Sequence, residues 1–154
     1  MEFLRFKHAR FAASFPKSFL YSRSHYWMAP AADGPGLWHV GFTKFSTRML
    51  GELVEASFEV AADAPIEPGQ EIGSVEGFKA ASAVYSVMRG TFGEMNPVLS
   101  QDACVVKSDP YQVGWLYSAR GEPEADFLSA EQYLALLHET IARLAAAEHK
   151  EGDV

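Results

Sequence analysis

The sequence predicts a mostly β fold with one short internal helix and one helix at the C-terminal end. Through the first three-quarters of the chain, short apolar runs alternate with turn signals rich in glycine and proline, which is typical of antiparallel strands. Only the last part shows apolar residues at sustained helical spacing. With 154 residues, no low-complexity tract and no sign of a second domain, the chain is expected to form one fold rather than several.

The first strands are predicted at Phe19–Arg23, Tyr26–Ala29 and Leu37–Phe42. The last two are separated by Asp33-Gly34-Pro35-Gly36, a sequence that favours a turn. A short helix is predicted for residues 43–51, because Thr43 is a suitable N-cap and glycine 51 a suitable end. Within this helix the apolar residues share one face: Phe45, Met49 and Leu50.

Extended structure resumes at Leu53–Val60, where alternation predicts that Val54, Ala56 and Phe58 lie on one side of the strand. A turn follows at residues 65–69, which contain two prolines and a glycine.

Two further strands, Glu71–Gly77 and Ala80–Tyr85, flank Phe78 and Lys79 with the spacing of a β-hairpin. A lysine on such an exposed turn offers an amine for covalent attachment, since functional groups concentrate on loops held by a rigid scaffold. Most surface lysines are nevertheless only solvated charges, so the position of Lys79 alone decides nothing.

Beyond the hairpin, strands are predicted at Arg89–Met95 and Gly114–Ala119, with Asn96-Pro97 opening a loop. Ala103–Val106 is a short apolar patch, and Asp109-Pro110 favours another turn.

The C-terminal helix is predicted for residues 129–148. Ser129 and Gln132 fit a capping box at its start. Its apolar stripe, which must pack on the rest of the fold, consists of Tyr133, Leu136, Leu137, Ile141 and Leu144.

Residues 1–19 form a basic arm that is rich in phenylalanine. Residues 1–24 hold five basic side chains against one acidic, a net charge of +4, so the remainder carries −11 of the total of −7. Such a start resembles an organelle transit peptide. Because Pro16 interrupts any amphipathic helix and the arm holds five phenylalanines, we expect instead an ordered arm packed on the domain of residues 20–154.

The composition argues against several classes of function. The acidic body disfavours nucleic-acid binding, which requires a basic surface, and suits docking onto basic partner proteins. No apolar run approaches the roughly 20 residues needed to cross a bilayer. The single cysteine, Cys104, is expected to be buried and fits a reducing compartment, so we expect a cytoplasmic protein without membrane attachment.

No catalytic or metal-binding constellation is evident. The five histidines lack the spacing of metal ligands, and none of the common nucleophile motifs occurs. Ser24 and His25 are adjacent, which would place their side chains on opposite faces of a strand. We therefore expect neither catalytic residues nor a metal site, and a protein that is not an enzyme.

Several segments together resemble the glycine cleavage system H protein, in order and spacing, from about Leu20 to Leu137. The Asp-Pro-Tyr-x-x-Gly-Trp pattern is the most specific of them. The segments are Tyr21-Ser-Arg-Ser-His-Tyr-Trp27, Val40-Gly-Phe-Thr43, Leu50-Gly-Glu-Leu-Val54, Glu76-Gly-Phe-Lys-Ala80 and Asp109-Pro-Tyr-Gln-Val-Gly-Trp-Leu116.

The resemblance implies a barrel-sandwich hybrid of two small antiparallel sheets, with an amide-linked lipoyl group on Lys79 at a hairpin tip. It implies that Glu76 is the acid by which lipoylating enzymes recognise the site, although a solvated turn carboxylate is an equally good interpretation. In this family the lipoyl group takes an aminomethyl group from the decarboxylating P protein and presents it to the aminomethyltransferase, the T protein. The L protein, dihydrolipoyl dehydrogenase, then reoxidises the dithiol.

Two positions depart from the family pattern. Tyr26 stands where the family usually has glutamate, and Ala83 where it usually has aspartate. The resemblance places these acids beside a cleft that shelters the loaded arm, where Ser24 remains. Losing both removes two charge-assisted hydrogen bonds of about 1.5–3 kcal/mol each. Gly77 and Phe78 also replace the usual Ser-Val, which makes the turn more apolar.

Three functions stay open at this point. The first is service as the lipoyl carrier of glycine cleavage, as a monomer that docks on each partner in turn. The second is an H-like paralogue that serves another lipoate-dependent system or relays lipoate. The third is a structural or binding module without the cofactor.

Overall fold

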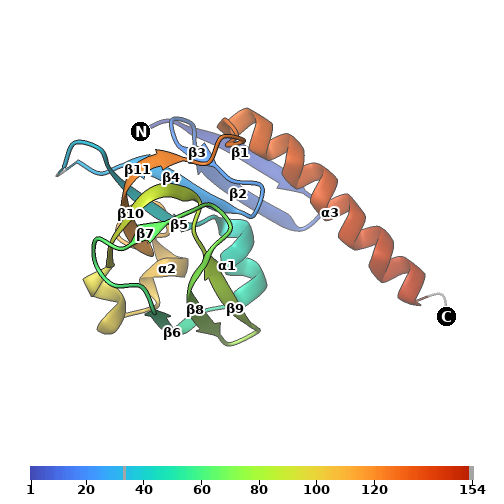
Figure 1. Ribbon diagram of the computed structural model, residues 1–154. Coiled ribbons are helices and arrows are strands. Elements are labelled where there is room, and N and C mark those ends of the chain that lie inside the picture. Colours follow the sequence, from blue (N-terminus) through green and yellow to red (C-terminus); the bar gives the residue numbers. More distant parts are fainter. Residues whose placement is uncertain (33, 153–154) are drawn as a thin grey trace.

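The computed structural model describes residues 1–32 and 34–152, with side chains as far as Glu148. Its largest sheet has the strand order β3-β4-β5-β11-β10-β7, a second sheet has the order β6-β8-β9, and β1 and β2 form a separate hairpin (Figure 1). Every strand pairing is antiparallel. The strands are β1 (Phe3–His8), β2 (Phe11–Pro16), β3 (Leu20–Tyr21), β4 (Tyr26–Pro30), β5 (Leu37–Phe42), β6 (Leu53–Phe58), β7 (Pro65–Ile66), β8 (Glu71–Gly77), β9 (Ala81–Tyr85), β10 (Met88–Met95) and β11 (Tyr117–Pro123).

The helical elements are short except for the last. They are α1 (Lys44–Leu50), the 3₁₀ turn η1 (Pro97–Ser100), α2 (Val105–Ser108) and α3 (Ala130–Gly152). The predicted fold class is confirmed: the chain is mostly strands in antiparallel sheets, with a short internal helix and a C-terminal helix. Of the predicted turn before β5, Asp33 lies outside the described residues, as do the side chains of His149 and of the residues after it.

The main apolar core lies between the six-stranded and three-stranded sheets. Met28, Val40 and Phe92 reach it from the larger sheet, and Val75 and Val84 from the smaller one. All five are almost completely buried, and burying such side chains contributes roughly 1.5–3 kcal/mol each. This core fixes β8 and β9 and therefore the hairpin between them.

A second core covers the opposite face of the larger sheet. Alternation along β4 divides its side chains between the two cores: Tyr26 and Met28 enter the main core, whereas Trp27 and Ala29 enter the second. The second core also receives β1, β2 and α3, which lie together on one side of the molecule (Figure 1).

The N-terminal arm is ordered. Its two strands pair from Phe3 with Pro16 to His8 with Phe11. Phe6, Phe11 and Phe15 are buried in the second core, and Phe15 is completely inaccessible. The arm ends are further tied by the hydrogen bond from the amide of Lys17 to the carbonyl of Glu2, 2.9 Å long.

The capping box predicted for α3 is confirmed. The amide of Gln132 donates to Ser129 Oγ (3.2 Å) and the amide of Ser129 to Gln132 Oε1 (2.9 Å). Tyr133 and Leu137 are fully buried, but the predicted stripe ends earlier than expected, because residues 142–148 are exposed. Figure 1 shows the second half of α3 projecting from the body. Among the described helices none is both long and apolar enough to span a membrane.

Two local predictions are wrong. A β-bulge shifts the register between Leu53 and Glu55, so Leu53 is buried while Val54 is exposed. The last strand begins at Tyr117, not at residue 114. In the segment before it, the side-chain amide of Asn96 donates to the carbonyls of Val113 (2.7 Å) and Trp115 (2.9 Å), in place of a ladder of bonds to a neighbouring strand.

The apolar patch predicted at residues 103–106 continues into α2. Its Val106 is fully buried, and the loop predicted at Asn96-Pro97 contains η1, whose start is capped by the side chain of Asn96.

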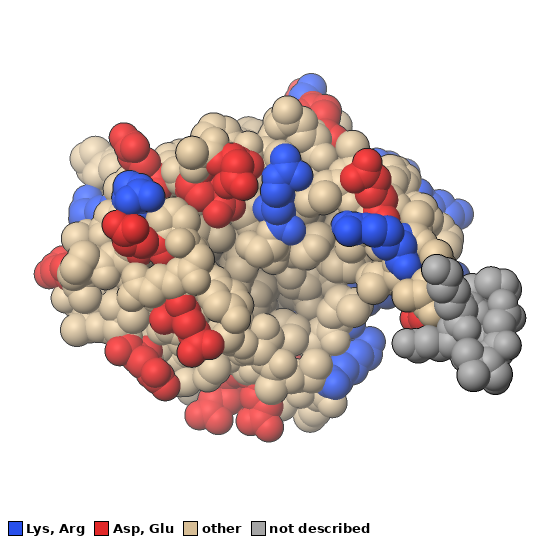
Figure 2. Space-filling model, turned by 45° about the vertical axis from the view of Figure 1, so that its right-hand side comes forward, with Lys and Arg blue, Asp and Glu red and all other residues tan. Residues whose placement is uncertain are grey.

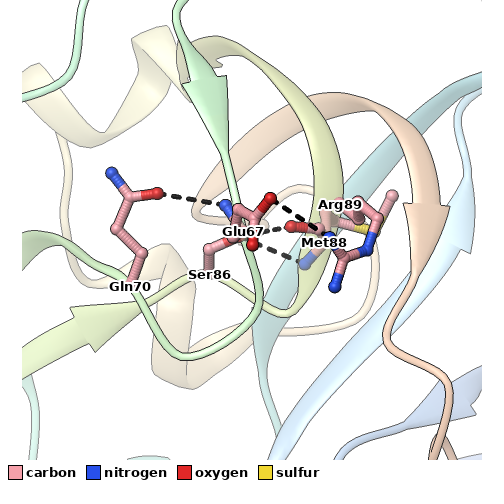
Figure 3. Close-up of polar contacts among 5 residues, drawn as sticks. All are labelled: Glu67, Gln70, Ser86, Met88 and Arg89. Atoms are coloured by element: carbon pink, nitrogen blue, oxygen red, sulfur yellow. Dashed lines mark hydrogen bonds and ion pairs between the residues drawn. The ribbon is translucent and has the colours of Figure 1, made fainter.

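The chain passes from the smaller to the larger sheet at a corner held by polar contacts (Figure 3). Ser86 Oγ accepts from the amide of Met88 (3.1 Å) and donates to its carbonyl (2.8 Å). The neighbouring turn after β7 is closed by a hydrogen bond from the amide of Glu67 to Gln70 Oε1 (3.0 Å), and Arg89 pairs with Glu67 at 3.1 Å. These contacts fix the end of β9 relative to β10.

Candidate functional site

Lys79 lies at the tip of the β8–β9 hairpin, as predicted, and is exposed to solvent. The tip rests against the end of α1. The amide of Lys79 donates to the carbonyl of Leu50 (2.9 Å), and the amide of Phe78 donates to the carbonyl of Glu52 (3.0 Å). The tip is therefore positioned by backbone hydrogen bonds, while the Phe78 side chain is 75% exposed.

Among the described residues, the Lys79 amine has a single polar contact. Its Nζ donates to the carbonyl of Arg48 at 3.2 Å, and it makes no ion pair with a carboxylate in the described part of the chain. An uncharged acceptor at this distance leaves the amine accessible, since no buried or charged partner must be displaced before it reacts. The Arg48 carbonyl belongs to the last turn of α1, where helices leave carbonyl groups without intrahelical donors.

Two glycines allow the close approach of the tip to α1. A Cβ at Gly77 would lie 2.3 Å from the carbonyl oxygen of Leu50, a distance that real side chains do not reach. Gly51 has a φ of 77°, which glycine adopts readily, and a Cβ there would lie 3.0 Å from Lys79 Cγ. Any larger residue at position 77 would therefore push the tip away from the helix.

A cleft of about 270 Å³ lies beside the tip. Its walls come from the β3–β4 turn, from α1 and from β9, so the structure brings together three of the predicted site residues: Ser24, Tyr26 and Ala83. The other lining residues are mostly apolar, and none is aspartate or glutamate: His25, Phe42, Phe45, Ser46, Met49, Leu50, Ser82 and Tyr85. We call this space the arm cleft.

Tyr26 is a structural wall of the arm cleft. Its ring stacks on Phe42 with centroids 5.3 Å apart, and its hydroxyl accepts a hydrogen bond from the amide of Tyr85 at 3.0 Å. Burial raises the pKa of Tyr26 to about 12, so the group is neutral at physiological pH. Ala83 is half-buried and adds no polar atom beyond its backbone.

Several polar groups of the arm cleft already form hydrogen bonds within the protein. Ser24 Oγ shares a 2.7 Å hydrogen bond with Ser22 Oγ. His25 Nδ1 lies 2.9 Å from the hydroxyl of Tyr133, which in turn bonds Thr43 Oγ1 at 2.8 Å. Burial lowers the pKa of His25 to about 4, so the imidazole is uncharged at pH 7.

The expectation that Ser24 and His25 lie on opposite strand faces is wrong. Both belong to the turn that precedes β4, His25 has a φ of 72°, and both line the arm cleft. In a turn, unlike in a strand, neighbouring side chains such as those of Ser24 and His25 can point into one space. Tyr133 was missed as a support of the cleft because it comes from α3, more than 100 residues away.

Glu76 lies apart from the arm cleft. Its exposed side chain lines a shallow depression on the three-stranded sheet, where it is paired across the strands with Glu55. Only Ser82 and Ala83 border both spaces.

Figure 2 shows acidic side chains along the left and lower edges of the molecule and most of the basic ones towards the centre and right.

Cys104 is exposed, so the expectation of a buried thiol is wrong. A side-chain hydrogen bond to Glu52, with the charge of Asp102 nearby, raises its pKa and makes the thiolate less abundant. Within the described residues no three potential ligand side chains come together as a metal site.

Comparison with known proteins identifies relatives of this arrangement. A family model described as glycine cleavage H-protein matches residues 19–140. The glycine cleavage system H protein of Streptomyces coelicolor is 34% identical over 121 residues, which cover 78% of this chain and 94% of that protein. The corresponding protein of Corynebacterium aurimucosum is 32% identical over 123 residues, or 79% and 94% of the two chains.

The same comparison holds for structure. The crystal structure of a glycine cleavage system H protein from Mycobacterium marinum superposes with a TM-score of 0.69 at 30% identity, covering 79% of this chain and 97% of that one. The β1–β2 hairpin precedes the segment matched by the family model, and α3 continues beyond it.

Proposed function

The chain belongs to the glycine cleavage H-protein family, and on that premise we propose that it is a non-catalytic carrier with a lipoyl group on Lys79. The observation that carries the proposal is the accessible amine of Lys79 at a hairpin tip, held by backbone hydrogen bonds beside a cleft. A tip that is fixed while its side chain stays free suits a group that must be modified and must then reach several enzymes.

The residues fit an amide-linked lipoyl group. The amine needs to give up only its bond to the Arg48 carbonyl, and the adjacent arm cleft has apolar walls suited to an acyl chain. When bound, the dithiolane supplies the redox and group-transfer chemistry. The protein contributes the fixed tip, through the Leu50 carbonyl, and the shelter of the cleft, through Phe45 and Tyr26.

We place the protein in the cytoplasm, where it serves the P, T and L proteins of glycine cleavage in turn and receives its cofactor from lipoylating enzymes. Glu76 supports this last role, because its carboxylate is exposed three residues before the lysine on the same hairpin. The paired Glu55 adds a second negative charge at the same place, which a basic partner surface would recognise.

A second candidate is an H-like carrier whose cargo is not the aminomethyl group. One observation favours it: the arm cleft contains no carboxylate, and its histidine is neutral. A protonated amine would gain no counter-ion there, whereas an uncharged cargo would lose nothing on entering.

Intact mass tests the shared part of both candidates. The protein expressed with lipoylating enzymes should gain the mass of one lipoyl group, and Lys79→Arg should abolish the gain. An unmodified wild-type mass would instead favour a structural or binding module without the cofactor.

Growth separates the two candidates. Deletion of the gene should prevent growth on glycine as sole nitrogen source if the protein serves glycine cleavage. Normal growth of the deletion strain would favour another lipoate-dependent system.

A further inference from the structure

A second groove, of about 360 Å³, adjoins the arm cleft, and we call it the α3 groove. It lies between the β1–β2 turn, one face of α1 and the projecting half of α3. Phe45 and Met49 line both the α3 groove and the arm cleft. Any molecule seated in the α3 groove would therefore lie next to the path of the Lys79 side chain.

Most of the α3 groove is built by segments outside the family match of residues 19–140. The β1–β2 turn supplies Phe11 and its neighbours, and α3 supplies residues from Ile141 onwards. The carrier fold itself contributes only the α1 face. The family model therefore covers the carrier site but not most of the residues that build this groove.

The floor of the α3 groove is apolar and exposed. Met49 is 52% and Leu144 42% exposed, although both are large apolar side chains. Leu144 continues the stripe that buries Tyr133 and Leu137 farther up α3, but here no element of the described chain covers it. Exposed apolar surface with a polar rim marks an interaction site for a protein, a membrane or a ligand, and the charges of the rim indicate which.

The rim of the α3 groove is basic. Arg10 and Arg48 line it, and neither forms an ion pair with a carboxylate among the described residues. Arg48 lies over the Phe11 ring at 5.2 Å, which holds the guanidinium in place and leaves its edge donors free. Glu148 is the single acidic residue of the lining.

We propose that the α3 groove docks an acidic segment of a partner enzyme, with one or more apolar side chains on the floor and carboxylates on Arg10 and Arg48. The charge complementarity is specific, because the protein as a whole carries −7 and would otherwise repel an acidic partner. The inference rests on the proposed function in one respect: the partner is an enzyme that acts on the Lys79 arm, since the groove borders the arm cleft.

Steady-state kinetics test the proposal in two sets of assays. In the first, the lipoylated full chain is the substrate of the purified P, T and L proteins. In the second, the unmodified full chain is the substrate of its lipoylating enzymes. The Arg10→Glu/Arg48→Glu variant should raise the KM of one partner by tenfold or more, with kcat within twofold of wild type. Lys7→Glu/Arg143→Glu is the matched control, because it makes the same charge change at exposed positions outside the groove. Unchanged KM values for every partner would overturn the proposal.

Leu144→Asp provides an independent variant. Leu144 is partly exposed near the end of the described helix, so the change should leave the thermal midpoint within about 2 °C of wild type. It should nevertheless raise the KM of the same partner. An increase with a different partner would contradict a single docking surface.

A binding measurement separates this inference from the proposed function. A synthetic 12-residue peptide of glutamate and leucine is titrated into the unmodified, ¹⁵N-labelled full chain, with a lysine–leucine peptide as the control. Chemical-shift changes at Arg10, Met49 and Leu144 with the acidic peptide alone support docking in the α3 groove, and the absence of such changes overturns it.

An unmodified mass in cells would contradict the proposal of a lipoyl carrier but would leave this binding result valid. Shifts that depend only on the concentration of the protein itself would make a second copy the occupant and would also overturn the proposal.

Discussion

The side-chain amine of Lys79 donates a hydrogen bond to the backbone carbonyl of Arg48, 3.2 Å away, across the gap between the β8–β9 tip and α1. The contact is exposed and involves no carboxylate, so it holds the amine weakly. The same helix end also accepts the Lys79 amide. Position and accessibility of the amine are therefore set by different bonds, one in the backbone and one in the side chain.

Replacing Lys79 by arginine should abolish lipoylation while leaving the fold intact. An arginine retains the positive charge, and an exposed substitution typically changes stability by no more than about 0.5 kcal/mol. Intact mass and urea unfolding measure the two effects. Lys44→Arg, at another exposed amine that donates to a backbone carbonyl, is the control and should remain lipoylated.

Introducing acids into the arm cleft should improve retention of an aminomethyl cargo. Ala83→Asp is expected to slow the release of ammonia or formaldehyde from the loaded protein, and Tyr26→Glu/Ala83→Asp to slow it further. The reason is that a carboxylate in this uncharged cleft supplies the missing counter-ion. Colorimetric assay of the released products follows the rate.

Ala83→Asp alone is needed because changing Tyr26 also affects the fold. Tyr26 is 3% exposed, and its hydroxyl accepts the hydrogen bond of the Tyr85 amide. Tyr26→Phe should therefore cost about 1–3 kcal/mol by leaving that donor without its partner. If Ala83→Asp folds normally and leaves the release rate unchanged, the cleft does not protect the cargo by charge.

Stability should depend on pH through two groups with opposite signs. Burial lowers the pKa of His25 from 6.5 to about 4, so the folded protein loses stability as the pH falls from about 6.5 to 4, by about 3 kcal/mol at most. Burial and the nearby Asp126 raise the pKa of Glu124 to about 7, which stabilises the fold below pH 4.5 and is lost as the pH rises through 7.

Chemical unfolding of Glu124→Gln isolates the histidine. In this background the free energy of unfolding should decrease from pH 6.5 to pH 4, and the further change His25→Asn should remove the decrease. Asparagine is chosen because it tolerates the positive φ of position 25. An unchanged slope would show that His25 does not titrate as its burial implies.

Gly77→Ala should both destabilise the protein and slow lipoylation. Its Cβ would meet the Leu50 carbonyl, and relief of such overlap typically costs about 1–3 kcal/mol and would move the tip away from α1. Gly69→Ala is the matched control: its φ of 86° also disfavours alanine, but no atom lies near the added Cβ. The control should lose some stability at an unchanged lipoylation rate.

The N-terminal arm should behave as part of the folded core. Phe15→Ala is expected to cost about 3–5 kcal/mol, because the ring is fully buried among aromatic neighbours that include Tyr21 and Tyr133. Phe3→Ala, at a position that is 46% exposed, should change the free energy of unfolding by less than about 0.5 kcal/mol. Equal effects of the two changes would contradict a packed arm.

Much of the fold could be predicted where local signals agreed. The bounds of β5 follow from the turn before it, the end of α1 from Gly51, and those of the hairpin around Lys79 from its spacing, all of which are local signals. At the start of α1, Thr43 makes no side-chain cap bond and instead bonds Tyr133. The bulge at Leu53 could not be predicted, because alternation alone does not show where a strand gains an extra residue. The start of β11 depends on the Asn96 side chain, whose bonds to residues 113 and 115 are not visible from sequence.

The candidate site divides in the same way. Tyr26 and Ala83 could be predicted from a motif, and both line the arm cleft. Lys79 lies outside the lining, on the tip that bonds the cleft residue Leu50. The supports of the site could not, because the His25–Tyr133–Thr43 chain joins three distant segments. The α3 groove likewise arises only when residues before position 12 and after position 140 meet across α1.

The hairpin tip is positioned by backbone hydrogen bonds to residues 50 and 52, and the exposed side chain of Phe78 takes no part in holding it. Such an arrangement separates the residues that an enzyme recognises from the bonds that set the position of the amine. Residues 78 and 80 can be substituted so that a different modifying enzyme recognises the tip. The distance by which the amine projects then stays constant. Substitution of these two residues could thus change the enzyme that modifies the protein, without any change in the β scaffold.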